Sequence, residues 1–415
     1  MTTTDEINAT PLDQLDVSRP DLFKNDTWQP WFARLRNEAP VHYLADSTNG
    51  AFWSVTSHAL IKEVDANNEV FSSEKGGISI VDAPPPEDGQ LQGKNFIAMD
   101  EPEHHKQRGA VSPTVAPRNL AELEPLIRER VIDILEHLPV GETFNWVQEV
   151  SVELTARMLA TLFDFPYENR RKLVYWSDLT TNVPQVTGDD SIDMKGRYEE
   201  LMGAAAAFYE LWMSKLGQPP TFDLISMLQH NPETAKMNED PELFLGNLLL
   251  LIVGGNDTTR NSISGGVLAL NQNPGEYDKL RDNPTLIPKM VPEIIRWQSP
   301  VAHMCRTAVK PVELGGKQIQ PGDKVVMWYI SGNRDASMIT TPDEFIIDRP
   351  NPRQHLSFGY GIHRCVGNRL GEMQLNILWQ EIMQRFDRIE VTGEPSYLRS
   401  NFIHGITDLP VTIKG

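Results

Sequence analysis

The chain has 415 residues, a formal net charge of −19 and a pI near 5.0. So acidic a chain is a poor partner for nucleic acid or for an anionic membrane surface. Its two cysteines, Cys305 and Cys365, are too few for a disulfide framework and favour a reducing setting. The polar N-terminus lacks the apolar core of a signal sequence, and the longest apolar stretch, residues 243–255, is too short to cross a bilayer. We therefore expect a cytoplasmic protein without a membrane span.

The first two thirds of the chain predict a short hairpin followed by helices. β-Forming runs at residues 41–44 and 52–55 flank a turn, and a helix is expected from His58. Residues 73–98 combine glycine pairs, three consecutive prolines and spaced apolar residues, which predicts a long lid-like loop. From residue 119 to about 270, apolar residues recur at helical spacing. This run has breaks near 139–141, 183–190 and 218–221, and the second break is a candidate flap.

The last third predicts a few strands and one more long helix. Strand-like runs occur at residues 308–314 and 324–329, with turns at 315–316 and 321–323. After Cys365 the apolar residues again follow helical spacing as far as Phe386. The pattern predicts a mainly α fold with a smaller antiparallel β region.

Residues 358–367 carry the most informative motif, FGYGIHRCVG, in which Cys365 follows a glycine-rich turn at the start of a predicted helix. A helix N-terminus offers backbone N–H donors and a positive dipole end, which stabilise a thiolate that binds a metal. Gly359, Gly361 and Gly367 lack a Cβ, so the backbone there can approach a flat cofactor. We hypothesise that this cofactor is haem. The alternative is a buried structural cysteine at a helix cap.

The motif resembles the cysteine-ligand loop of the cytochrome P-450 superfamily, which reads Phe-Gly-x-Gly-x-His-x-Cys-x-Gly, at every fixed position. The resemblance implies the cytochrome P-450 fold for residues 1–415 as a single domain, where length alone would favour two or three. It also implies haem b with the Cys365 thiolate as the axial iron ligand. Further haem contacts implied by position are Phe358, Gly359, Val366 and Gly367.

A second motif is the run of weak helix formers GGNDTT at residues 254–259, directly after an apolar segment. Glycine lowers helix stability and threonine can bond back to the preceding turn, so we expect a distorted turn with room for a small molecule. The segment resembles the oxygen-activating helix of the superfamily. By that resemblance Gly254 and Thr258 lie against the cofactor, Thr258 holds the iron-bound oxygen species and Asp257 links it to solvent. A simple helix kink with a satisfied carboxylate is the alternative.

Other family positions concern the haem propionates and the rigidity of the pocket. Two propionates in a buried site need cations or hydrogen-bond donors. The resemblance assigns this role to four basic residues, His104, Arg108, Arg306 and His363. It also implies that Glu293, Arg296 and Arg349 form a buried triad that serves folding rather than chemistry.

Four segments, residues 96–100, 255–262, 295–300 and 331–335, look like the bacterial alkane and fatty-acid terminal hydroxylase subfamily. This resemblance implies ω-hydroxylation, in which one oxygen atom from O2 enters a terminal C–H bond of a medium-chain alkane or fatty acid. An iron-sulfur ferredoxin and an NAD(P)H-dependent ferredoxin reductase would supply the electrons. The substrate contacts carried over by position are apolar or small: Ile97, Leu250, Val253, Gly254, Val301, Ala302, Phe402 and Ile403.

Three other readings of the sequence stay open. A P-450 enzyme could act on a terpene, a steroid or another bulky hydrophobic substrate. A haem-thiolate peroxygenase would use hydrogen peroxide without electron partners, but such relatives typically lack the acid and alcohol pair at Asp257 and Thr258. A haem sensor would bind the cofactor without oxidising a substrate.

Overall fold

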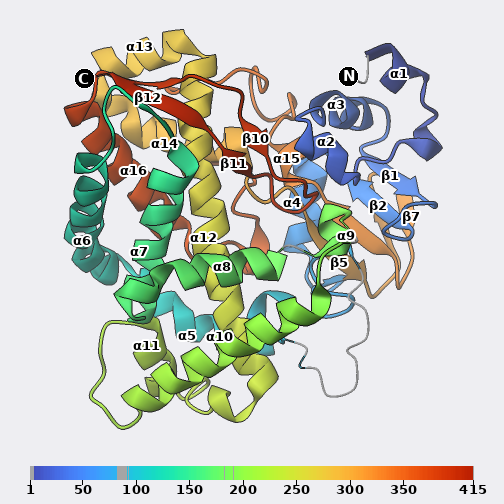
Figure 1. Ribbon diagram of the computed structural model, residues 1–415. Coiled ribbons are helices and arrows are strands. Elements are labelled where there is room, and N and C mark those ends of the chain that lie inside the picture. The colour runs from blue at the N-terminus through green and yellow to red at the C-terminus, as the bar shows by residue number, and fades with distance from the viewer. Residues whose placement is uncertain (1–3, 82–90, 92, 182, 190, 415) are drawn as a thin grey trace.

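The computed structural model describes residues 4–81, 91, 93–181, 183–189 and 191–414. Helices dominate the fold, as predicted, and long helices surround the central helix α12 (Figure 1). The helices are α1 (Thr4–Ala9), α2 (Pro20–Lys24), α3 (Gln29–Glu38), α4 (His58–Ala66), α5 (Glu103–Val111), α6 (Pro117–Glu136), α7 (Val152–Phe163), α8 (Arg170–Thr181), α9 (Pro184–Thr187), α10 (Met194–Lys215), α11 (Leu224–His230), α12 (Pro241–Gln272), α13 (Pro274–Asp282), α14 (Ile287–Gln298), α15 (Tyr329–Gly332) and α16 (Asn368–Arg385).

The strands form small sheets, and the largest joins the N-terminal hairpin to segments from the last third of the chain. Its order is β1-β2-β8-β5-β3, and only the β2–β8 pair is parallel. These strands are β1 (Val41–Leu44), β2 (Phe52–Val55), β3 (Phe71–Ser72), β5 (Met304–Ala308) and β8 (Lys324–Met327). The other sheets use β4 (Thr143–Asn145), β12 (Pro410–Lys414) and β9 (Arg388–Val391), then β6 (Val312–Leu314) with β7 (Lys317–Ile319), and β10 (Ser396–Tyr397) with β11 (Ile406–Asp408).

The predicted hairpin at 41–44 and 52–55 and the helix from His58 are confirmed. The predicted strand at 308–314 is confirmed only at its two ends, because β5 ends at Ala308 and β6 begins at Val312. Pro311 lies between them and has no N–H to donate to a sheet. Of the predicted lid at 73–98, residues 82–90 and 92 lie outside the described residues, and the rest of it forms only a 3-10 turn at Phe96–Ala98.

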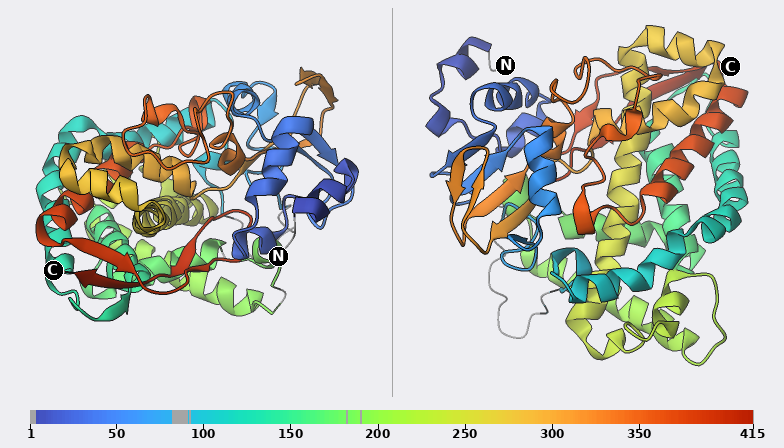
Figure 2. Two further views of the ribbon diagram at one scale, coloured as in Figure 1. Left: turned by 90° about the horizontal axis from the view of Figure 1, so that it is seen from above. Right: turned by 180° about the vertical axis from the view of Figure 1, so that it is seen from behind.

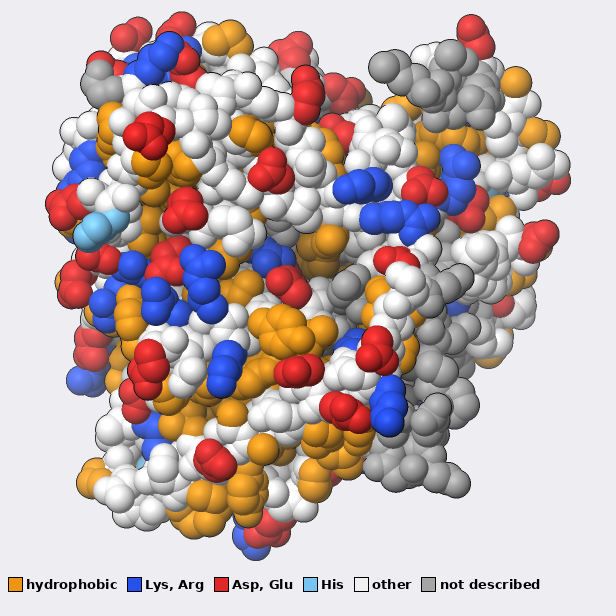
Figure 3. Space-filling model, viewed as in Figure 1, with side chains coloured by type: hydrophobic (Ala, Val, Ile, Leu, Met, Phe, Trp, Pro, Cys, Tyr) orange, Lys and Arg blue, Asp and Glu red, His pale blue; other side chains and the backbone are white. Residues whose placement is uncertain are grey.

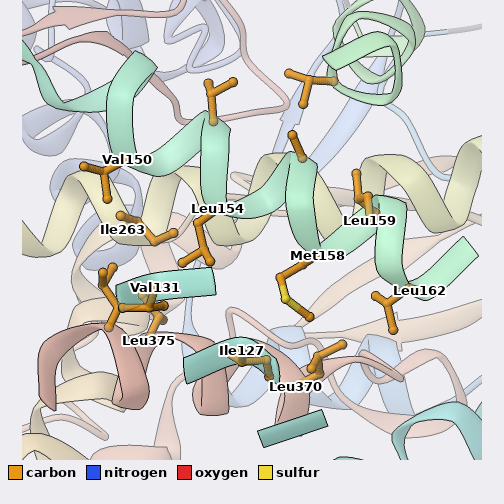
Figure 4. Packing of buried hydrophobic residues seen from close by; sticks show 14 of the residues in the cluster. Ile127, Val131, Val150, Leu154, Met158, Leu159, Leu162, Ile263, Leu370 and Leu375 are labelled. Carbon is orange, nitrogen blue, oxygen red and sulfur yellow. The ribbon is translucent and has the colours of Figure 1, made fainter. Parts of the chain in front are cut away.

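Helix α12 runs through the middle of the molecule and organises the core. Asp240 caps its N-terminus by accepting hydrogen bonds from the backbone N–H groups of Glu242 and Leu243, and Pro241 occupies the first turn. The helix continues without a break through the GGNDTT segment, so the expected distortion there does not interrupt it. Apolar side chains of α6, α7, α12 and α16 interdigitate beside it (Figure 4).

The two sides of α12 have different neighbours. Helices α8 and α10 cross it on the front of Figure 1, whereas the loop that carries Cys365 lies behind it, as the views from above and from behind agree (Figure 2). On the front face, hydrophobic side chains gather in the lower half, over α10 and α11 (Figure 3). Tyr209, Met213 and Leu216 are among the exposed apolar residues of this region.

Candidate active site

A cavity of about 730 Å³ lies beside the middle of α12 and extends from the Cys365 loop to the facing ends of α8 and α10. This volume falls in the range of pockets that hold small molecules and cofactors. Its walls come from α5, α8, α10, α12, β5, the segment before α16 and residues 402–403. The walls are mainly apolar, and no Asp or Glu is among the described residues that form them. The net charge of the whole chain is −19, yet its many acidic side chains lie outside the described walls of this cavity.

The cysteine loop brings a sulfur atom to this cavity. The exposed surface of Cys365 opens into the cavity, and its backbone N–H donates to the Phe358 carbonyl at 2.8 Å. Gly359 and Gly361 adopt φ of +65° and +66°, which favours glycine at both positions. At Gly361 a Cβ would also lie 2.2 Å from the backbone oxygen of Asp65. These two glycines therefore fix the turn that presents the sulfur.

The sulfur lies just before α16 rather than inside it, since this helix begins at Asn368. Burial raises the pKa of the Cys365 thiol, but hydrogen bonds from the backbone N–H groups of Gly367 and Asn368 and the charges of Arg108 and Arg364 act in the opposite direction. The expected backbone donors and cations are present, and they stabilise the thiolate form.

The four predicted basic residues, His104, Arg108, Arg306 and His363, meet on one wall of the cavity. The rings of His104 and His363 lie 4.2 Å apart between centroids. Both ring nitrogens of His104 and the Nδ1 of His363 are buried and have no hydrogen-bond partner among the described residues, and the nearest carboxylate oxygen to His104, that of Glu101, lies 3.6 Å from its Nδ1. Burial and the charges of Arg306 and the neighbouring basic groups lower the pKa of His363. The two histidines are therefore neutral, and the wall offers an anion their ring N–H donors together with the guanidinium groups of Arg108 and Arg306.

Asp65 joins this wall to the cysteine loop, and the sequence analysis missed it. Its carboxylate pairs with Arg306 at 3.0 Å and accepts hydrogen bonds from the Tyr329 hydroxyl at 2.7 Å and the Tyr360 backbone N–H at 3.0 Å. Burial raises the pKa of Asp65, whereas Arg306, Tyr329 and the Tyr360 N–H oppose that shift. One carboxylate of α4 thus orients Arg306 and holds the glycine-rich turn.

The predicted acid and alcohol lie next to each other in α12 but face different surroundings. Thr258 lines the cavity, and its hydroxyl donates to the Gly254 carbonyl at 2.8 Å. Asp257 does not line the cavity. It is buried against α8, where the Ser177 hydroxyl donates to it at 3.2 Å and Arg260 pairs with it at 2.5 Å.

The surroundings of Asp257 give it an unusual acidity. Burial raises its pKa to about 6, and Asp178 adds to the shift, while Arg260 and Ser177 reduce it. Arg260 also pairs with Asp178 at 2.9 Å, and the Asp178 side chain is half exposed. A charged network therefore connects the buried acid to the outer surface of α8, and neither Asp178 nor Arg260 was assigned a role from the sequence.

The predicted substrate contacts gather on the apolar part of the cavity, with one exception. Seven of them line it, namely Ile97, Leu250, Val253, Gly254, Val301, Phe402 and Ile403. Ala302 does not line it, because successive residues of an extended segment point to opposite sides. Its side chain is buried in a separate apolar cluster with Cys305 and Trp328.

The predicted triad is buried away from the cavity. Glu293 forms ion pairs with Arg296 at 2.7 Å and with Arg349 at 3.0 Å, and all three side chains are buried. Arg296 and Arg349 also donate to backbone carbonyls of residues 333–344. The triad fastens α14 to the segment that leads into the cysteine loop.

Within the described part of the chain, no helix is both long and apolar enough to cross a membrane. A model of the cytochrome P450 family matches residues 214–406. Linalool 8-monooxygenase of Pseudomonas putida is 35% identical over 97% of this chain and 99% of its own length. Two solved structures are 45% identical. Cytochrome P450-153 from Novosphingobium aromaticivorans has a TM-score of 0.90 and covers 96% of this chain and 99% of its own. CYP153D17 from Sphingomonas sp. PAMC 26605 has a TM-score of 0.91, with 98% and 100% covered. The chain therefore belongs to the cytochrome P450 family of haem-thiolate monooxygenases.

Proposed function

We propose that this protein holds haem b through the thiolate of Cys365 and inserts one oxygen atom from O2 into terminal C–H bonds of medium-chain alkanes or fatty acids. The observation that carries this proposal is a single cavity that joins the Cys365 sulfur, a wall with four basic residues and a mainly apolar wall. The likeness of the four segments named above to the terminal hydroxylase subfamily supports the substrate class.

The residues that line the cavity fit a haem. Its flat ring would lie against Gly254, Thr258, Phe358, Gly359, Val366 and Gly367, all of which line the cavity. Its two propionates would receive hydrogen bonds from His104, Arg108, Arg306 and His363, because each guanidinium has more N–H groups than the contacts to Asp65, Cys305 and Arg364 use and the His104 ring nitrogens have no hydrogen-bond partner among the described residues. When bound, a thiolate-ligated haem supplies the oxidant that attacks the C–H bond.

Thr258 and Asp257 supply the protons in this proposal. The Thr258 hydroxyl gives its hydrogen to the Gly254 carbonyl, so its oxygen lone pairs remain free to accept a hydrogen bond from the cavity side. Asp257, with a pKa of about 6, is half protonated near pH 6 and about one tenth protonated at pH 7, so both of its forms are populated and it can release and regain a proton there. The exposed side of Asp178 gives this network access to solvent protons.

The apolar wall orients the substrate. Ile97, Val253, Val301, Phe402 and Ile403 surround the space with hydrocarbon, which favours an unbranched chain and excludes water from the reacting carbon. Electrons would come from an iron-sulfur ferredoxin and its NAD(P)H-dependent reductase. The exposed side chains of Lys106, Arg364 and Arg369 offer positive charge beside the cysteine loop for an acidic ferredoxin.

The test is the position of the new hydroxyl group. Purified holoenzyme, ferredoxin and reductase are incubated with octane or octanoic acid, and the products and consumed NAD(P)H are quantified. We expect mainly the primary alcohol or the ω-hydroxy acid, in proportion to the reductant used. Mainly subterminal products, or no turnover of any linear chain, would contradict the substrate class.

A second candidate substrate class is the terpenes, favoured by the match to linalool 8-monooxygenase over nearly the whole chain. The same assay with linalool separates the two candidates. Turnover of linalool together with inert octane and octanoic acid would establish the second candidate in place of the first.

A further inference from the structure

Arg197 is a cation on the cavity wall that has no acidic partner. It lies in the first turn of α10, where its Nε donates to the Leu179 carbonyl at 2.6 Å and its Nη2 to the Thr180 carbonyl at 3.3 Å. No carboxylate of the described residues pairs with it, and burial lowers the pKa of its guanidinium. Its Nη1 has no hydrogen-bond partner within the part of the chain that the structure describes.

The contrast with the other two arginines of the cavity is informative. Arg306 is paired with Asp65, and Arg108 donates to the Arg364 carbonyl beside the cysteine loop. Both belong to the wall that would receive the two haem propionates. Arg197 lies on α10, which is not part of that wall, so the haem propionates would not supply it with an anionic partner.

Capping of α8 is the simplest structural role for Arg197, since arginine often binds the last carbonyls of a helix. That role uses Nε and Nη2 but leaves the hydrogens of Nη1 unused. Tyr198, the next residue, also lines the cavity. Its hydroxyl accepts a hydrogen bond from the Leu91 N–H at 3.1 Å, so its own hydrogen remains available to an acceptor. Both side chains thus line the cavity with hydrogen-bond donors that no described residue uses.

Arg197 and the cysteine loop lie at separate parts of the same cavity. Helices α8 and α10 are on the front of α12 and the Cys365 loop is behind it (Figures 1 and 2), yet Arg197 and Cys365 both line the one continuous space. Apolar side chains of α12, Leu250 and Val253 among them, line the same space. A linear molecule with one charged end and one hydrocarbon end matches this distribution of charge and apolar surface.

We propose that Arg197, assisted by Tyr198, binds the carboxylate of a fatty acid whose methyl end points toward the Cys365 loop. The inference rests on the proposed function and narrows its substrate class from alkanes or fatty acids to fatty acids. The guanidinium forms charge-assisted, bidentate hydrogen bonds to a carboxylate, which an alkane or an ester cannot accept with equal strength.

The first measurement uses the unaltered holoenzyme. Dodecanoic acid and methyl dodecanoate are titrated separately, and Kd is obtained from the change in haem absorbance and from calorimetry. We expect the acid to bind at least about tenfold more tightly than the ester, as a charge-assisted hydrogen bond at a desolvated cation requires. Equal affinities, or tighter binding of the ester, would overturn the inference without any variant being made.

The second measurement compares Arg197→Gln with Arg197→Lys. The Gln variant should weaken binding of the acid by about tenfold to a hundredfold and change binding of the ester by less than about twofold. The Lys variant, which keeps the charge, should retain most of the affinity for the acid. If Arg197 only caps α8, acid and ester will weaken together in the Gln variant, and that result would contradict carboxylate binding.

The positional assay described above keeps the two proposals separate. If the products are subterminal but the acid still binds more tightly than the ester in an Arg197-dependent way, the proposal of terminal hydroxylation fails and the proposed carboxylate site stands. If the products are terminal but acid and ester bind equally well, terminal hydroxylation stands and the proposed carboxylate site fails.

Discussion

The sharpest prediction concerns Asp257→Asn, which removes one buried ionisable group and keeps the shape of the side chain. Folding raises the pKa of Asp257 from 3.8 to about 6, so the folded protein holds this proton more tightly than the unfolded chain. The contribution of this group to stability is therefore most favourable below pH 3.8 and falls as the pH rises to about 6. A difference of roughly two pKa units corresponds to a loss of about 3 kcal/mol in total.

About 1.4 kcal/mol of that loss falls between pH 5 and pH 7.5. Urea unfolding of the wild type and the variant at pH 5, 6 and 7.5 measures it, because all other groups titrate in both proteins. The decline in unfolding free energy over this interval should be smaller by about 1.4 kcal/mol in Asp257→Asn. Parallel pH profiles for the two proteins would refute the assignment of a raised pKa to Asp257.

The same variant tests proton delivery. We expect product formation to fall by about 10²-fold or more, as for loss of a positioned acid-base group. The wild-type rate should also show a pH dependence with an apparent pKa near 6 that the variant lacks. Asp178→Asn is the comparison variant: it removes a charge that raises the pKa of Asp257 and weakens the path to solvent but leaves the acid in place, so it should lower the rate less than Asp257→Asn does. It should move this pH dependence to lower pH rather than abolish it.

Two further predictions concern the frame of the site. Gly361→Ala should reduce haem content and Tm far more than Gly316→Ala. Both positions have positive φ, but only at Gly361 would a Cβ lie 2.2 Å from the Asp65 backbone oxygen. Equal decreases in Tm in differential scanning calorimetry would contradict this prediction. Glu293→Gln should lower the free energy of unfolding by about 3–5 kcal/mol, since it leaves buried arginines without their counter-ion. Glu372→Gln, at a partly exposed ion pair, should lower the free energy of unfolding by under about 1 kcal/mol. If urea unfolding gave similar losses for Glu293→Gln and Glu372→Gln, a structural role for the buried triad would be disproved.

The features that depend on neighbours in sequence were predictable. The hairpin, the start of the helix at His58 and the turn before Cys365 follow from local propensity, turn residues and glycine spacing. The two motifs around Cys365 and Asp257 were recognised as family segments, and the structure brings Cys365 and Thr258 to one cavity. A short sequence window carries all the information that these features need.

The features that depend on distant segments could not be read in advance. Asp65 meets Arg306 and Tyr360, which are more than two hundred residues away, and nothing in its own helix distinguishes it from a surface acid. Arg197 likewise has an ordinary helical neighbourhood, and only the packing of α10 against α8 brings it to the cavity. Ala302 was assigned by position alone, and the alternation of an extended segment turned it toward the core.

The most direct test of the account is the absorbance spectrum of the reduced protein with carbon monoxide. The account predicts a strongly red-shifted Soret band for the wild type, as expected of an iron with a thiolate ligand. The band should persist in Cys305→Ala, whose sulfur is buried in an apolar cluster, and disappear in Cys365→Ala. A wild-type protein without this band, or a Cys365→Ala variant that keeps it, would contradict the central claim.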